Sequence, residues 1–182
     1  LAHCGNWELL ARIFGTRVNR LHVVAKPMRN GRVERWLREK REKSGVRVIY
    51  RDRALRSILN ALKKNEVVAI LIDQNPGQHH GTRAPFLGKP AYTIRTAAGV
   101  ALKTECGVIA TRAVIQDDGS YRIVISEVET KKAAEGEERE DAITRVQHMH
   151  NDVISSIIQR YPEHYFGWFH RRFKGILSYK NV

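Results

Sequence analysis

A histidine and a glutamate near the start of the chain have the spacing of a catalytic pair. His3 is followed by Cys4, Gly5, Asn6 and Trp7, and then by Glu8. A neutral imidazole accepts protons near neutral pH, and it works best when a carboxylate accepts a hydrogen bond from its other nitrogen. We therefore predict that His3 is a general base, oriented by Glu8. The spacing alone also fits a structural histidine followed by a capping glutamate.

The elements around this pair favour a strand-to-helix turn. Gly5 permits a tight turn, and Asn6 is a suitable N-cap for a helix that starts at Trp7. Glu8 would then lie in the first helical turn, near the positive end of the helix dipole. We expect this helix to stop at Gly15, as a C-terminal glycine often does.

A second group of polar residues follows a buried strand. Residues 67–72 form a continuous apolar run, which is typical of a parallel strand covered on both faces, and the run ends in Asp73 and Gln74. Functional sites in open α/β sheets gather at the carboxyl ends of strands. We expect Asp73 and Gln74 to face the same site as His3, and a role in capping the next turn is the alternative.

The order of the other expected elements indicates an α/β fold. Strands 21–25 and 46–50 alternate with helices 31–43 and 53–64, whereas 75–82 is expected to be a mobile loop and 84–88 a short apolar segment. Later elements are a helix over 93–104, a hairpin of strands 107–115 and 121–128, and a long helix over 142–161. We predict a mixed sheet with flanking helices, parallel in its first part and antiparallel later.

Length and composition favour one domain. The chain has 182 residues, of which 42% are hydrophobic, enough for a core. No apolar run approaches the roughly 20 residues of a membrane span, and no signal peptide is visible. The chain begins without Met, at what reads as the end of a buried strand. We therefore expect residues 1–182 to be a single domain that lacks its N-terminal part.

Positive charge is concentrated in one segment. The net charge is +13, and residues 12–64 hold 17 of the 32 Lys and Arg but only 4 of the 19 acidic residues. Such a segment attracts polyanions, although a merely solvated basic face is the alternative. Arg41, Arg51 and Arg53 are candidates for phosphate contacts. A nucleic-acid-binding module is a remote alternative, because Trp36 is the only aromatic residue in the basic helix.

Four blocks, taken together, resemble the lipid A biosynthesis acyltransferase family, the late lauroyl- and myristoyl-type transferases of Gram-negative bacteria. The first block, HCGNWELL, is similar to the catalytic H-x4-[D/E] block of that family. The others, in the order of the family, are ALKKNEVVAILIDQNPG, APFLGKPAYTIRTAAGVALKTECGVIATRAV and YPEHYFGWFHRRFK. The resemblance spans almost the whole chain.

This resemblance implies the α/β sandwich fold of the glycerolipid acyltransferases, with His3 as the general base and Glu8 as its partner. It implies an acyl chain on acyl carrier protein as the donor and a phosphorylated glucosamine lipid as the acceptor, at the cytoplasmic face of the inner membrane. Another acceptor, such as a phosphatidylinositol mannoside or an aminolipid, stays open. No cofactor and no nucleic-acid partner are expected. The candidates for substrate binding are Asn6, Arg41, Arg53, Asp73, Gln74, Arg171 and Arg172.

The C-terminal block joins aromatic and basic residues. Trp168, Phe169 and Phe173 stand among Arg171, Arg172 and Lys174. Such a combination suits a membrane surface, and packing of the rings in the core is the alternative. The pairs His79-His80 and His148/His150 lack a convergent third ligand, so no metal site is predicted.

Overall fold

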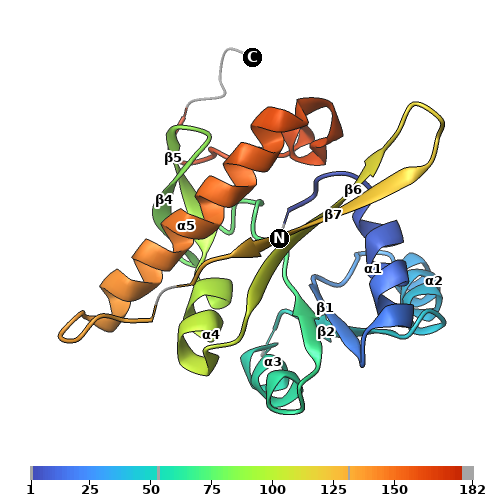
Figure 1. The fold of residues 1–182 in the computed structure, drawn as a ribbon, viewed down its shortest axis with the longest axis horizontal. Helices are drawn as coiled ribbons and strands as arrows, with labels where there is room; N and C mark the ends of the chain where they lie inside the picture. The colour runs from blue at the N-terminus through green and yellow to red at the C-terminus, as the bar shows by residue number, and fades with distance from the viewer. Residues whose placement is uncertain (1, 53, 131, 178–182) are drawn as a thin grey trace. The chain divides into compact units, whose positions relative to one another are not determined.

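The computed structural model describes residues 2–52, 54–130 and 132–177 (Figure 1). It divides into two compact units. The smaller unit comprises Asn6–Ile70, and the larger unit comprises Leu1–Gly5 together with Leu71–Val182. The sequence prediction of a single acyltransferase domain stays a prediction, and the two units are described separately.

A three-stranded parallel sheet forms the centre of the smaller unit. Its strand order is β2-β1-β3, and Val23 lies opposite both Val48 and Ala69. The strands are β1 (Leu21–Ala25), β2 (Val46–Tyr50) and β3 (Val67–Ala69), and the helices are α1 (Trp7–Arg17), α2 (Gly31–Glu42) and α3 (Ala54–Lys63). The core of this unit is aliphatic and includes Leu21, Val46, Ile49, Ile58 and Ala61.

Helix α1 continues past the glycine at which it was predicted to stop. It runs to Arg17, and Val18 is its C-cap. A Cβ atom at Gly15 would collide with the carbonyl oxygen of Ser44. The glycine is therefore explained by close packing of α1 against the turn before β2, and the prediction of a helix stop was wrong because that contact is invisible in the local sequence.

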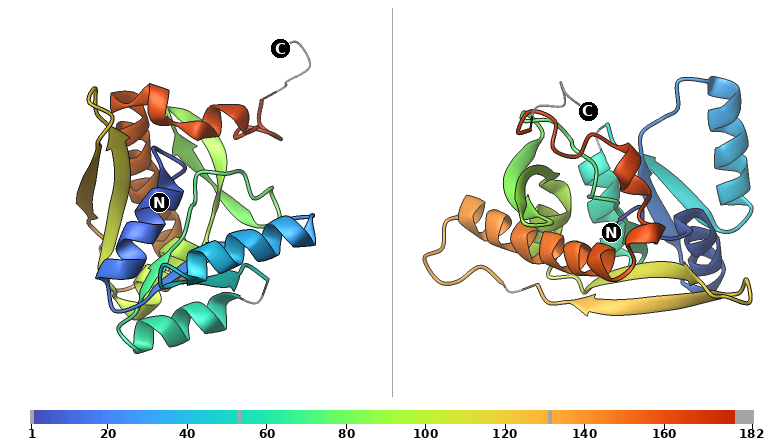
Figure 2. Two further views of the ribbon diagram at one scale, coloured as in Figure 1. Left: turned by 90° about the vertical axis from the view of Figure 1, so that its right-hand side faces the viewer. Right: turned by 90° about the horizontal axis from the view of Figure 1, so that it is seen from above.

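The larger unit contains two antiparallel hairpins and two main helices. Its elements are β4 (Gly81–Phe86), β5 (Lys89–Ile94), α4 (Thr96–Thr104), β6 (Val108–Ile115), β7 (Tyr121–Val128), α5 (Arg139–Arg160) and the 3₁₀ turns Pro162–His164 and Phe166–Phe169. Both views of Figure 2 show the β6–β7 hairpin as a long two-stranded ribbon. Helix α5 packs against β4 and α4, around a small core of Ala98, Ile143 and Val146.

Two sequence predictions in this region differ from the structure. Residues 75–80 contain neither helix nor strand, as the loop prediction requires, but residues 81–94 form the unpredicted β4–β5 hairpin. Its turn residues Leu87 and Gly88 both have positive φ, 49° and 73°. The strand predicted over 67–72 ends at Ala69, although Ile72 is buried. The apolar run correctly indicates burial, but only residues 67–69, which pair with β1, form a strand.

The α/β class is confirmed, with a parallel sheet early in the chain and antiparallel pairs later. The pairing is divided among three small sheets and is not one continuous mixed sheet. None of the described helices has both the length and the apolar character needed to cross a bilayer.

Candidate active site

His3 and Asp73 form a hydrogen-bonded pair in the larger unit. The imidazole Nδ1 lies 2.9 Å from Oδ1 of Asp73, and the backbone N–H of His3 donates to Oδ2 at 3.0 Å. The His3 side chain is 17% exposed, whereas that of Asp73 is fully buried. Since an ionised carboxylate only accepts, Nδ1–H donates and the neutral imidazole carries its lone pair on Nε2. This is the arrangement of a carboxylate-oriented general base.

The backbone around His3 is held from two sides. Cys4 forms an antiparallel bridge with Tyr165, and the carbonyl oxygen of His3 accepts from the N–H of Phe166 at 2.9 Å. Gly5 forms a bridge with Ala113 of β6 and has φ of +68°. A Cβ atom at Gly5 would collide with the Ala113 carbonyl oxygen. The glycine therefore serves both the turn and the close approach of two chains.

Asp73 keeps its charge despite its burial. Burial raises the pKa of Asp73, but the hydrogen bonds from His3, together with the attraction of the imidazole when it is protonated, outweigh burial and hold that pKa below its ordinary value. The next turn is tied to the C-terminal segment, because the Nδ2 group of Asn75 donates to the carbonyl oxygens of Arg172 and Lys174 at 3.0 and 2.9 Å. The pair is therefore supported by segments far apart in sequence.

Tyr165 is buried close to Asp73. Burial raises the pKa of Tyr165, and the negative charge of Asp73 raises it further, so the phenol stays protonated. Its ring occupies the space where a side chain of Gly167 would stand, and a Cβ atom there would collide with the ring. Burial likewise raises the pKa of the Cys4 thiol to about 11, which makes it a poor nucleophile.

Arg172 is a buried cation with structural contacts. Its guanidinium donates to the carbonyl oxygen of Tyr92 and to the Thr93 hydroxyl, the latter at 2.7 Å, and it lies 4.5 Å from the centre of the Phe86 ring. Burial lowers the pKa of Arg172 to about 10, against the opposing effects of Tyr165 and Asp73. These contacts fasten the C-terminal segment to β5, and substrate binding by Arg172 stays a prediction.

The other predicted residues of the larger unit lie at its surface. Gln74 and Arg171 are exposed. His170 is also exposed, yet partial burial lowers its pKa, with opposition from Asp73 and further lowering by Arg172 and His3. The charges of His3 and Asp73 therefore influence the pKa of His170.

Glu8 belongs to the smaller unit, where its carboxylate is bound by Arg41. The guanidinium Nε donates to Oε2 at 3.1 Å, and a second N–H donates to Oε1, so the contact is bidentate. The Arg41 side chain is 14% exposed and that of Glu8 is 37% exposed. The imidazole Nδ1 is hydrogen bonded to Asp73, and orientation of His3 by Glu8 stays a prediction.

Asn6 caps α1, as the sequence predicts. Its side-chain oxygen accepts from the N–H of Leu9 at 3.0 Å. Arg53, predicted to bind substrate, lies outside the described residues. Arg51 is exposed, and its Nε lies 3.7 Å from a carboxylate oxygen of Asp52.

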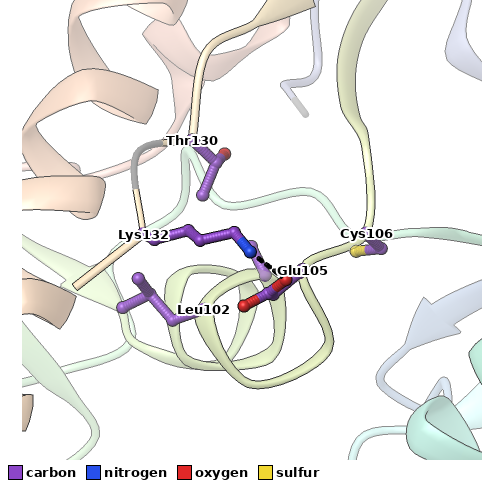
Figure 3. A pocket seen from close by; sticks show the side chains of 6 residues that line it. Leu102, Glu105, Cys106, Thr130 and Lys132 are labelled. Atoms are coloured by element: carbon purple, nitrogen blue, oxygen red, sulfur yellow. Dashed lines mark hydrogen bonds and ion pairs between the residues drawn. The ribbon is translucent and has the colours of Figure 1, made fainter.

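A small pocket at the C-terminal end of α4 is separate from these residues. The ammonium group of Lys132 donates to a carboxylate oxygen of Glu105 at 2.5 Å, and Figure 3 shows this pair among the side chains that line the pocket. The pocket is lined by Ala101, Leu102, Glu105, Cys106, Thr130 and Lys132. None of the predicted site residues lines it. Within the described ranges, no three His, Cys, Asp or Glu side chains are arranged to hold a metal ion.

Sequence reasoning missed the contributions of Tyr165 and Asn75. Both stand inside the blocks that the sequence singled out, yet neither has a residue type that suggests acid–base chemistry at neutral pH. The available signal was the placement of Asn75 two residues after Asp73, which is suited to tying a turn.

A family model described as bacterial lipid A biosynthesis acyltransferase matches residues 1–175. No curated protein matches the chain.

Proposed function

This chain belongs to the bacterial lipid A biosynthesis acyltransferase family, and we propose that it moves a fatty acyl chain from acyl carrier protein to a hydroxyl group of a lipid A precursor. The observation that carries the mechanism is the hydrogen bond between His3 Nδ1 and the buried carboxylate of Asp73. Membership supports acyl transfer in lipid A biosynthesis, and the donor, the acceptor hydroxyl and the residue roles are our proposals.

The reaction needs one proton acceptor that later becomes a proton donor. The acceptor hydroxyl attacks the thioester carbonyl carbon while Nε2 of His3 takes its proton. The tetrahedral intermediate then collapses, the carbon–sulfur bond breaks, and the imidazolium returns the proton to the leaving thiolate. The products are an ester and the free thiol of the carrier. The Asp73 carboxylate stays ionised throughout and stabilises the imidazolium.

Glu8 has a different part in this proposal from the one that its spacing suggests. Its bidentate contact with Arg41 joins α1 to α2 within the smaller unit. We propose that Asp73 orients the imidazole, and that the ion pair of Glu8 with Arg41 stabilises the smaller unit. Substrate binding by Arg41 stays a prediction.

The proposed donor suits the charge of the smaller unit. Residues 26–43 carry eight Lys and Arg but three Glu, and α2 buries none of its residues. Acyl carrier protein is acidic, so this segment offers complementary charge. Reversal of Arg35 and Arg38, both exposed, should raise the KM for the carrier thioester about tenfold or more and weaken its dependence on salt.

The matched control for that experiment is Arg122→Glu, which reverses an exposed charge on β7. The docking proposal fails if the control and the α2 variant change KM equally. Localisation at the cytoplasmic face of the inner membrane follows from the proposed substrates, and it stays part of the proposal.

The decisive experiment for the function supplies a labelled acyl carrier thioester together with a lipid A precursor and identifies products by mass spectrometry. We expect one new ester on the precursor from the wild-type chain and none from His3→Ala. Transfer to a phosphatidylinositol mannoside or aminolipid, with the lipid A precursor unchanged, would overturn the proposed acceptor. Near-normal transfer by His3→Ala would overturn the proposed base.

A further inference from the structure

An exposed group of aromatic side chains lies next in sequence to the segment that holds His3. Phe166, Trp168 and Phe169, here called the aromatic cluster, are 59%, 56% and 85% exposed. All three belong to one short 3₁₀ turn, Phe166–Phe169. Exposure of three large rings in one turn is costly in water and marks a surface that contacts something apolar.

Contacts connect the cluster to the segment that carries His3. Trp168 packs edge-on against the buried Tyr165 with ring centres 5.1 Å apart, and its indole N–H donates to the Pro162 carbonyl oxygen at 2.7 Å. The ring centres of Phe169 and Phe166 are 5.5 Å apart. The backbone N–H of Phe166 donates to the carbonyl oxygen of His3. The cluster is therefore joined to the backbone of the proposed base by the hydrogen bond from Phe166 to His3.

Exposed cations lie on both sides of the cluster in the sequence. Arg160, Arg171 and Lys174 are exposed, and Glu163 is the exposed acidic residue within 160–175. Aromatic rings beside Lys and Arg suit the boundary between lipid headgroups and hydrocarbon, where the rings enter the apolar region and the cations meet phosphates.

We propose that the aromatic cluster and its flanking cations form the surface by which the larger unit binds an anionic lipid bilayer. Bound this way, the segment that carries His3 lies at the membrane surface, where a lipid acceptor presents its hydroxyl. This inference rests on the proposed function, because a lipid acceptor is what gives the site a reason to lie at the bilayer.

Charge and size favour a bilayer over a protein occupant. A second copy of the chain would bring the same cations face to face. A stable protein interface also needs about 800 Å² from each partner, more area than three rings of a single short turn offer. A bilayer needs only a few inserted rings with favourable headgroup contacts.

Fluorescence of Trp168 tests the contact directly. With Trp7 and Trp36 replaced by Phe, the full chain is mixed with vesicles of phosphatidylethanolamine and phosphatidylglycerol that carry bromine on their acyl chains. We expect a blue shift and strong quenching by the brominated lipid. Emission that stays unshifted and unquenched while the protein is bound to the vesicles would overturn the proposal. A matched chain that keeps only Trp36, exposed on α2, compares the two surfaces, and quenching of Trp36 alone would likewise overturn it.

A second experiment tests the consequence for transfer. Phe169→Ser and Ile125→Ser each remove an exposed apolar side chain of the larger unit, 85% and 56% exposed. The measured quantity is the rate with acceptor in vesicles divided by the rate with acceptor dispersed in detergent. We expect Phe169→Ser to lower this ratio about tenfold, as loss of one inserted phenyl ring implies, and Ile125→Ser to leave it unchanged. Equal ratios for the two variants would contradict the proposal.

The two experiments separate this inference from the proposed function. Absence of transfer by the wild-type chain in both vesicles and detergent would refute the function and leave the quenching result intact. A change from dimer to monomer in Phe169→Ser, with Trp168 unquenched by vesicles, would assign the cluster to a second copy and overturn the bilayer proposal.

Discussion

Replacement of Asp73 by Asn removes the charge that faces the imidazole and keeps the shape of the side chain. The carboxylate is fully buried and lies 2.9 Å from Nδ1. At an effective dielectric constant of about 20, two charges about 4 Å apart interact by roughly 4 kcal/mol. The neutral amide of Asn, which keeps one hydrogen bond to the imidazole, retains roughly 1 kcal/mol of this interaction energy. The difference, roughly 3 kcal/mol, predicts a loss in kcat of about 150-fold.

The amide adds a second effect that makes the loss larger. Its NH₂ group is a donor, so when it faces Nδ1 it favours the tautomer with the proton on Nε2, which cannot act as a base. In the Ser-His-Asp triad of serine proteases, replacement of the aspartate by asparagine lowers kcat by about 10⁴-fold, because the histidine adopts the wrong tautomer. We therefore expect kcat for Asp73→Asn to fall between about 10² and 10⁴-fold, with a smaller change in KM.

The assay is steady-state acyl transfer with the labelled carrier thioester, with thermal unfolding measured in parallel. Because the pKa of Asp73 is lowered in the fold, its ionised form stabilises the folded state above the pKa of the unfolded chain, and that stabilisation is lost as pH falls. Some loss of Tm is thus expected for Asp73→Asn. Asp152→Asn, an exposed site on α5, is the matched control. The reasoning fails if Asp73→Asn keeps a third of the activity, or if its effect multiplies fully with that of His3→Ala, since residues acting as a unit are not additive.

Three further changes test the supports of the site and the fold. Gly5→Ala should lower the free energy of unfolding by at least about 2 kcal/mol, because φ is positive and the Ala113 carbonyl oxygen blocks a Cβ atom; an unchanged Tm would contradict this. His150 is buried, and burial lowers its pKa to about 4. As pH falls from about 6.5 to 4, the unfolded chain therefore binds a proton at this histidine before the folded chain does. The free energy of unfolding should drop by about 3 kcal/mol over that range. His150→Leu should flatten this part of the stability curve, and equal slopes would refute it. Glu8→Gln should cost about 1 kcal/mol in stability, since Arg41 loses its ion pair but Glu8 is partly exposed; urea unfolding measures it, and a more stable variant would contradict the contact.

Local sequence patterns predicted most of the elements but not the long-range supports. The alternation of strands and helices before residue 70 and the hairpin predicted over 107–128 are both present in the structure. The β4–β5 hairpin was missed because its strands contain Pro85 and Pro90, residues that argue against a strand. Gly15 was misread because its reason is the Ser44 carbonyl oxygen, distant along the chain.

The candidate site was predicted only in part, because local sequence does not reveal contacts between distant segments. Strand-end reasoning placed Asp73 with His3, and the two side chains are hydrogen bonded. Sequence spacing placed Glu8 with His3, but spacing in sequence carries no information on Arg41, which binds that carboxylate from α2. Tyr165 was not foreseen, because only the fold brings the C-terminal segment against Cys4.

The central claim is that Asp73 accepts from Nδ1 of His3, so that the neutral imidazole takes the acceptor proton on Nε2. Nitrogen-15 NMR of a chain with labelled histidine, assigned by comparison with His3→Gln, reports the tautomer directly. We expect a protonated Nδ1 and an unprotonated Nε2 near neutral pH, and loss of this preference in Asp73→Asn. A neutral His3 that carries its proton on Nε2 in the wild-type chain would contradict the account.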